Sequence, residues 1–268
     1  MKLTYSKPHI NYQEQVELLK SRNLLVSNDA YATSKLSHIN YYRLSAYARH
    51  YYCDETDIFR DGTRFEDILR LYYFDKKLRN IIFYAIEKIE VYLRTKYAYL
   101  VGSKFGAFGY IDMTHVHSPA TQSSILASIQ TEVKRSKEIF VSHFFENYEG
   151  KYLPVWSMVE VTSFNTLSRL FSNLKEKEQN EIADSLGLKA IVFKQWLHTI
   201  TYVRNICAHH SRLWNKMLAV RPIKPRRNQT FTKLNNKKIF FVLTMIVYLL
   251  EQIDGDEYDF KAEVKNLV

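Results

Sequence analysis

The stretch FKQWLHTITYVRNICAHHSR, residues 193–212, carries both an apolar and a polar helical pattern. At about 100° per residue, a helix places its largest apolar side chains on one stripe. These are Phe193, Trp196, Ile200, Val203 and Cys207. The opposite face holds Thr201, Arg204, Asn205, Ala208, His209 and Arg212. His210 falls on the other flank, near the stripe. We therefore predict one helix over 193–212 with a buried stripe and a polar face.

The polar face combines groups that suit a phosphodiester. Arg204 and Arg212 repel each other unless an anion bridges them, and phosphate does so because guanidinium groups donate in a flat fork. Histidine side chains exchange protons near neutral pH. Asn205 lies four residues before His209, so its amide can touch and orient the ring. We interpret Arg204, Asn205 and His209 as catalytic candidates. An RNA 2′-hydroxyl can serve as the nucleophile, so no metal-activated water is required.

Other interpretations of the histidines stay open. A histidine near a helix C-terminus can cap carbonyl groups and stabilise the helix dipole, or both histidines can be satisfied in the core. A zinc site built from Cys207, His209 and His210 is disfavoured, because adjacent histidines point in different directions and no second ligand pair is visible. We expect no metal and no cofactor.

The net charge of +10 comes from one segment of the chain. Residues 185–250 contain no Asp or Glu and 12 of the 38 Lys and Arg, which leaves 26 basic against 28 acidic side chains elsewhere. Such a block indicates a polyanion partner, and a solvated face without a partner is the alternative. The segment RPIKPRRNQTFTKLNNKK (221–238) is the preferred RNA backbone contact. The predicted substrate-binding residues are His210, Arg212, Arg221, Lys224, Arg226 and Arg227.

The composition favours an all-α fold in the cytoplasm. The 268 residues include only 7 Gly and 5 Pro, and 46% are hydrophobic, whereas all-β folds need many turns. Two distant cysteines do not indicate a secreted disulfide scaffold. No signal peptide is visible, and the apolar run 239–250 is too short to cross a bilayer. We expect a reduced, cytoplasmic protein without membrane contact.

The elements divide into a small N-terminal helical region, 1–60, and a larger helical domain, 61–268. Short helices are expected within 11–52, with Asn11 as a cap, before a polar turn at 53–64. The Gly-free run 65–101 predicts a long helix that stops at Gly102, with a break near Phe74 as an alternative. Glu90 and Arg94 are placed to pair across one turn of it. Further helices are expected over 120–149, after Pro154 (one or two helices), over 178–187 and over 239–250.

Several segments resemble a known family. RNICAH, Arg204 to His209, is similar to the R-x4-6-H signature of the HEPN superfamily. YVRNICAHHSRLWN (202–215) resembles the AbiD/AbiF-like bacterial abortive-infection family within it. Three other segments agree: INYYRLSAY (39–47), LYYFDKKLRNIIFYAIEKIEVYLRTKYAY (71–99) and LPVWSMVEVTSFNTLSRLF (153–171). Together they cover most of the chain from about residue 20 to 222. The chain departs from relatives that have Gly at Asn40, Ala46 and Asn165, positions that affect turns or packing.

The resemblance implies a HEPN-like helical bundle with a small N-terminal appendage, a homodimer and a metal-independent endoribonuclease. In such proteins the signature lines a cleft between two protomers. Carried over, Arg204 holds the phosphate, Asn205 orients or helps bind, and His209 handles the proton. The resemblance also implies 2′,3′-cyclic phosphate ends and a toxin that halts growth on phage infection. Some relatives are held in check by a structured non-coding RNA, which is therefore an expected partner.

Two other functions remain open. The chain can be a non-catalytic RNA-binding module that recognises a structured RNA, or an interaction protein that blocks a phage or host component. Tyrosines near the N-terminus add a related question, because they either stack on unpaired bases beside Arg43 and Arg49 or pack with their hydroxyl groups at the surface. These are Tyr41, Tyr42, Tyr47, Tyr51 and Tyr52. We favour packing for most of them.

Overall fold

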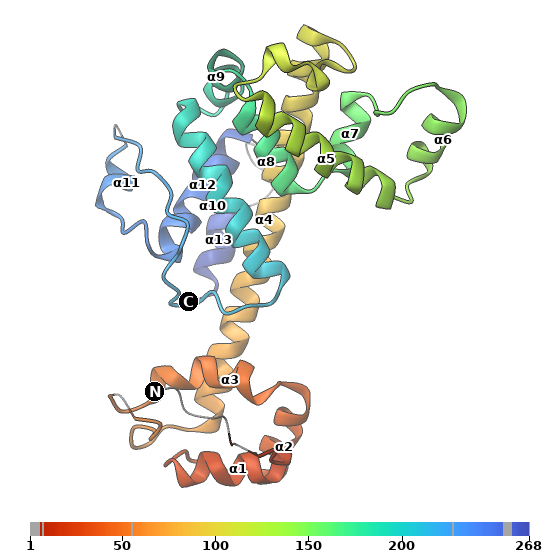
Figure 1. Ribbon diagram of the computed structural model, residues 1–268. Helices are drawn as coiled ribbons and strands as arrows, with labels where there is room; N and C mark the ends of the chain where they lie inside the picture. Colours follow the sequence, from red (N-terminus) through yellow and green to blue (C-terminus); the bar gives the residue numbers. More distant parts are fainter. Residues whose placement is uncertain (1–5, 7, 55, 227, 254–258, 268) are drawn as a thin grey trace. The chain divides into compact units, whose positions relative to one another are not determined.

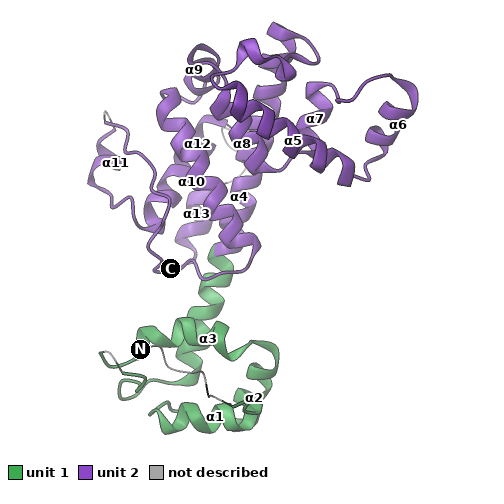
Figure 2. Ribbon diagram, in the orientation of Figure 1, with its two compact units in different colours: residues 1–78 green, residues 79–268 purple. Residues whose placement is uncertain are grey.

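The computed structural model describes residues 6, 8–54, 56–226, 228–253 and 259–267, and in this part the regular elements are helices (Figure 1). Extended backbone is paired there only in isolated bridges, such as Leu25 with Arg64. The predicted all-α class is confirmed. The chain divides into two compact units, Met1–Leu78 and Arg79–Val268 (Figure 2). This division falls inside a long helix, whereas the sequence places the boundary after residue 60.

Unit 1 consists of short helices, as the sequence predicts. They are α1 (Tyr12–Ser21), α2 (Asp29–His38), α3 (Tyr41–Ala48) and the 3-10 turn η1 (Arg49–Tyr51). Asparagine caps begin the three α-helices, and Asn11 forms the predicted cap as part of a capping box with Glu14. These side chains accept hydrogen bonds from otherwise unpaired N–H groups of the first turn. The core beneath them includes Tyr47, Phe59 and Phe65.

The long helix α4 (Phe65–Phe105) is continuous and belongs to both units. Its apolar stripe, including Ile82, Ile86, Ile89 and Leu93, is fully buried as predicted. The predicted stop at Gly102 is wrong. A Cβ on Gly102 would lie 3.5 Å from Val155 Cγ1, an ordinary contact distance, so the helix runs through this residue without any need for glycine there. The helix ends before Gly106, whose φ of +79° suits glycine.

The rest of unit 2 is a set of helices that follow α4 in the chain. They are the 3-10 turns η2 (Gly109–Ile111) and η3 (Met113–His115), then α5 (Pro119–Arg135), α6 (Ile139–Asn147), α7 (Val155–Val161), α8 (Phe164–Asn173), α9 (Glu176–Asp184), α10 (Ala190–Ala208), α11 (Gln229–Lys233), α12 (Ile239–Ile253) and α13 (Phe260–Lys265). The single helix predicted over 120–149 is wrong, because the chain leaves helical geometry at Ser136 and resumes as α6. The expected start after Pro154 is confirmed.

Helix α12 contains the most apolar run of the sequence and lies in the core of unit 2. Phe241, Val242, Met245 and Ile246 have no exposed surface. Among the helices that the structure describes, none is both long enough and apolar enough to cross a bilayer. The run is therefore explained by burial within the unit.

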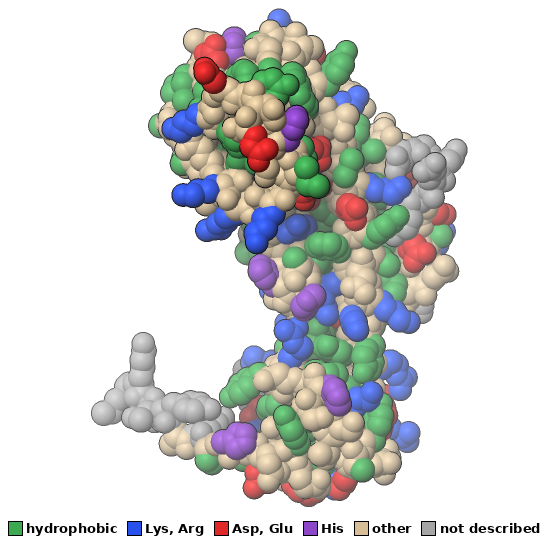
Figure 3. Space-filling view, turned by 90° about the vertical axis from the view of Figure 1, so that its right-hand side faces the viewer, with side chains coloured by type: hydrophobic (Ala, Val, Ile, Leu, Met, Phe, Trp, Pro, Cys, Tyr) green, Lys and Arg blue, Asp and Glu red, His purple; other side chains and the backbone are tan. Residues whose placement is uncertain are grey.

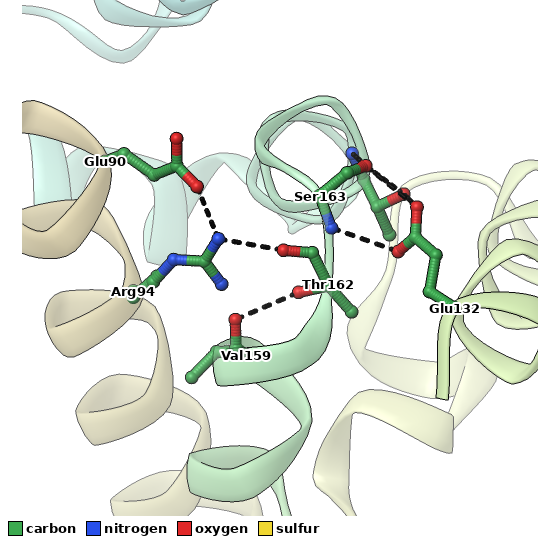
Figure 4. A network of polar contacts seen from close by, with 7 residues as sticks. Glu90, Arg94, Glu132, Val159, Thr162 and Ser163 are labelled. Atoms are coloured by element: carbon green, nitrogen blue, oxygen red, sulfur yellow. Dashed lines mark hydrogen bonds and ion pairs between the residues drawn. The ribbon is translucent and has the colours of Figure 1, made fainter. Parts of the chain in front are cut away.

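A polar network fixes the junction between α7 and α8 (Figure 4). Arg94 pairs with Glu90 across one turn of α4, as predicted, and donates to Thr162 O at 2.8 Å. From α5, Glu132 accepts from Ser163 N at 3.1 Å and from Ser163 Oγ at 2.8 Å. The pair is thus structural, because it holds a carbonyl group that the end of α7 leaves without a helical partner.

Replacing Arg94 tests this role. Arg94→Ala removes a pair whose side chains are only 12% and 15% exposed, so we expect the free energy of unfolding to fall by about 2–4 kcal/mol. The matched control is Arg70→Ala on the same helix, which removes a pair between Asp67 and an exposed arginine and should cost less than about 1 kcal/mol. Chemical denaturation measures both variants, and equal losses would contradict the structural role.

Candidate functional site

Helix α10 is oriented by its apolar stripe. Phe193, Trp196, Ile200 and Val203 have no exposed surface and Cys207 is 4% exposed, so the predicted stripe is confirmed. The helix packs against α8, α9 and α12 within unit 2. Because one side of α10 is enclosed in this way, the residues on its other side are held toward the surface.

The end of α10 differs from the prediction. The helix begins at Ala190 and ends at Ala208, not at residue 212, and His209 is its C-cap. His210 has φ of +54°, and its N–H donates to Cys207 O at 3.0 Å. Ser211 N–H donates to Ile206 O at 3.0 Å. This is a Schellman motif with histidine at the position that glycine usually occupies.

The early stop corrects two placements. His210 is exposed and lies beyond the helix, not near the buried side, and Arg212 is half-buried in the following segment rather than on the polar face. Thr201, also predicted on that face, is 4% exposed and donates from Oγ1 to Leu197 O at 2.8 Å. The helical polar face is therefore narrower than the sequence suggests.

Arg204 is held by an aromatic ring of α4. Its guanidinium carbon lies 5.5 Å from the centroid of the Phe83 ring, at cation–π distance. The two residues line a pocket of about 220 Å³ together with Glu87, Glu90, Val91 and Arg94. The segment around Arg204 has no carboxylate in sequence, but the fold brings two from α4 into the same pocket.

Phe83 and Glu87 are not among the site residues predicted from the sequence. The available signal is an aromatic residue next to the buried stripe of α4: Phe83 follows Ile82 directly and remains 39% exposed. An aromatic residue outside the core stripe of a long helix indicates a surface contact, but the pattern does not name the partner.

Asn205 and His209 are both exposed at the C-terminal end of α10. His209 N–H donates to Asn205 O at 3.0 Å, so a backbone hydrogen bond links these two candidate residues. Asn205 and His209 thus offer side chains to solvent near the end of the helix that carries Arg204.

The predicted substrate-binding residues lie in the segment after α10. Arg221 and Arg226 are exposed, whereas Lys224 is half-buried and donates from Nζ to Thr232 O at 3.0 Å. Arg227 lies outside the described residues. The segment is attached to α10, since Trp196 Nε1 donates to Ile223 O at 2.9 Å. Basic, histidine and hydrophobic side chains share the surface drawn in Figure 3.

The histidines and cysteines do not form a metal-ligand cluster in the described part of the chain. No group of three or more His, Cys, Asp or Glu residues there could hold a metal ion. Cys207 is a buried thiol on the core stripe.

The site lies in an all-α chain whose signature residues sit at the end of one helix. The family described as Abi-like protein matches residues 34–215, more than half of the chain and including Arg204 to His209. The chain therefore belongs to this family, and the membership supports a role in abortive infection. No curated protein matched, and no solved structure matched.

The left-handed conformation of His210 generates a stability prediction. A non-glycine residue in this region is strained by about 1–2 kcal/mol. His210→Gly and His210→Ala remove the same imidazole, so their difference reports the backbone alone. We expect His210→Gly to have the higher free energy of unfolding, by about 1 kcal/mol. Denaturant titration of both variants measures the difference, and a less stable glycine variant would contradict the assignment.

Proposed function

We propose that this protein is a metal-independent endoribonuclease of abortive infection, with Arg204, Asn205 and His209 at its active site. The observation that carries the proposal is the arrangement at the end of α10. Arg204 is supported by the Phe83 ring, and Asn205 and His209 are exposed beyond it. Arg204 can donate hydrogen bonds to the phosphate, and His209 can carry a proton. Cleavage of RNA without a metal depends on these two roles.

In the proposed reaction, the ribose 2′-oxygen attacks the neighbouring phosphorus and the bond to the 5′-oxygen breaks. The 2′-hydroxyl loses its proton and the leaving oxygen gains one, so the products are a 2′,3′-cyclic phosphate and a 5′-hydroxyl. His209 carries a proton in this exchange. Arg204 donates to the phosphate oxygens, on which negative charge increases in the transition state. Asn205 binds or orients the reacting group.

Substrate approach is proposed to depend on the segment after α10. Arg221 and Arg226 are exposed there, and residues 185–250 carry no acidic side chain. Contacts to RNA phosphates from such residues fix the strand without reading its sequence. The Trp196 hydrogen bond to Ile223 O holds this segment next to the catalytic helix.

A second copy of the chain is proposed to complete the site. Next to Arg204, the α4 side chains Phe83 and Val91 are 39% and 54% exposed. Exposed apolar side chains around a functional arginine are typical of a protein interface. Docking of two copies through this part of α4 would place two sets of signature residues in one cleft.

The catalytic assignment predicts that His209→Ala lowers the cleavage rate at least about 100-fold, the lower range for loss of general acid–base catalysis. Cleavage of RNA in EDTA, with analysis of the product ends, measures this loss and the expected cyclic phosphate. His198→Ala is the matched control, because His198 is also exposed on α10 but lies outside the signature. Cleavage that survives His209→Ala would exclude the assignment and favour a non-catalytic RNA-binding role.

The interface proposal predicts that Val91→Asp yields a folded monomer, because enclosing a carboxylate in an apolar contact removes its hydration. Sedimentation velocity measures the oligomeric state. Ile191→Asp is the control, since Ile191 is 58% exposed at the start of α10, and it should remain dimeric and active. A wild-type protein that cleaves RNA as a monomer would refute this part of the proposal.

A further inference from the structure

Unit 1 contains a groove of about 1560 Å³ that the proposed reaction does not use. It lies between α1, α3 and the loop after η1, and it shares no residue with the α10 site. Side chains able to stack or to donate hydrogen bonds line much of it. They include Arg22, Tyr41, Tyr42, Arg49 and Tyr52.

The five tyrosines noted in the sequence separate into two groups. Tyr47 is 1% exposed and donates to Asp75 at 2.6 Å. Tyr51 donates to Asp67 O at 3.3 Å, and the Tyr52 ring lies 4.7 Å from that of Phe59. These three pack against protein, which agrees with the packing interpretation. Tyr42 differs, because 70% of it is exposed.

Tyr41 connects the exposed ring to the polar lining of the groove. The rings of Tyr41 and Tyr42 meet edge to face at 6.1 Å. Arg22 Nη1 donates to Tyr41 Oη at 3.2 Å. Burial raises the pKa of Tyr41, so its hydroxyl stays protonated at neutral pH. The base of the groove is therefore a fixed aromatic and guanidinium surface, with the Tyr42 ring projecting from it.

The charges of the groove nearly cancel. Arg22 forms an ion pair with Asp57 at 3.3 Å, and Asp54 also lines the groove together with the exposed Arg49. A ligand held mainly by charge would find little net attraction here. A ligand with flat faces gains from stacking, a contact that tolerates a low net charge.

We propose that this groove binds unpaired bases of a single-stranded RNA segment, with Tyr42 as the stacking platform and Arg49 on the adjoining phosphate. Arg49 is exposed in this lining, and a guanidinium group donates to a phosphate in a charge-assisted contact. Unpaired bases expose the faces that stack on tyrosine, whereas a duplex buries them. This site goes beyond the proposed function, because it contains none of the groups assigned to cleavage.

The test is fluorescence anisotropy with a labelled, unstructured 2′-O-methyl RNA of about twelve nucleotides, within the site sizes known for single-strand binders. All proteins compared carry Arg221→Ala and Arg226→Ala, which remove the phosphate contacts proposed after α10 and leave the groove intact. This probe cannot be cleaved by 2′-hydroxyl attack, so binding is measured whether or not the protein is a ribonuclease. Tyr42→Ala should weaken binding about five- to 100-fold, the loss expected for one stacked base. Tyr42→Phe should bind within about twofold of the protein that keeps Tyr42, because the ring provides the contact.

Tyr99→Ala is the matched control, since Tyr99 is 77% exposed on α4 outside the groove and should not change binding. Arg49→Ala is a second variant that should weaken binding and, unlike Tyr42→Ala, reduce the dependence of affinity on salt. Circular dichroism checks that each variant is folded. Equal affinity with and without Tyr42→Ala would overturn the proposal, as would equal binding of a hairpin duplex or tighter binding of a proline-rich peptide.

Discussion

Burial of one stripe of α10 is the constraint on which the candidate site depends. Phe193, Trp196 and Ile200 are completely enclosed, and each large apolar side chain contributes about 1.5–3 kcal/mol when it leaves water. Rotating the helix by one residue position, in the direction that brings Arg204 toward the core, would expose part of this stripe and bury the guanidinium group. The outward direction of Arg204 and Asn205 is therefore a consequence of packing, and no separate interaction is needed to produce it.

Much of the fold could be predicted from the sequence because the relevant signals are local. Apolar residues three and four positions apart specify the stripes of α4 and α10, and Asn11 marks a helix start through its own side chain. The Glu90–Arg94 pair is also a short-range feature. Arg204, Asn205 and His209 could be proposed as site residues on the same basis, since one helix carries the first two and caps itself with the third.

The sequence-based predictions fail or are incomplete where contacts between distant parts of the chain determine the structure. Gly102 reads as a helix stop, but α4 continues through it to Phe105, and the glycine with a left-handed conformation is Gly106. Phe83 and Glu87 reach the Arg204 pocket only because α4 lies against α10, a contact between residues more than a hundred positions apart. No sequence window contains both partners. Residues 185–250 contain no acidic side chain. In the fold, however, Arg204 lines a pocket with Glu87 and Glu90 of α4.

The left-handed turn at His210 is set by the backbone at the end of α10, where the helical pattern of the sequence carries no signal. Glycine forms this turn without the strain that a Cβ introduces, so the turn by itself does not require histidine. The chain nevertheless has an imidazole at this strained position, directly after the proposed proton carrier His209. Strain of this kind persists where the surrounding structure over-determines the conformation. Here the hydrogen bonds from His210 N to Cys207 O and from Ser211 N to Ile206 O hold the turn. The sequence suggested a helix over 193–212 that would include His210, whereas the observed helix ends at Ala208. The position of this side chain therefore follows from where the helix stops, and its substrate contact stays a prediction.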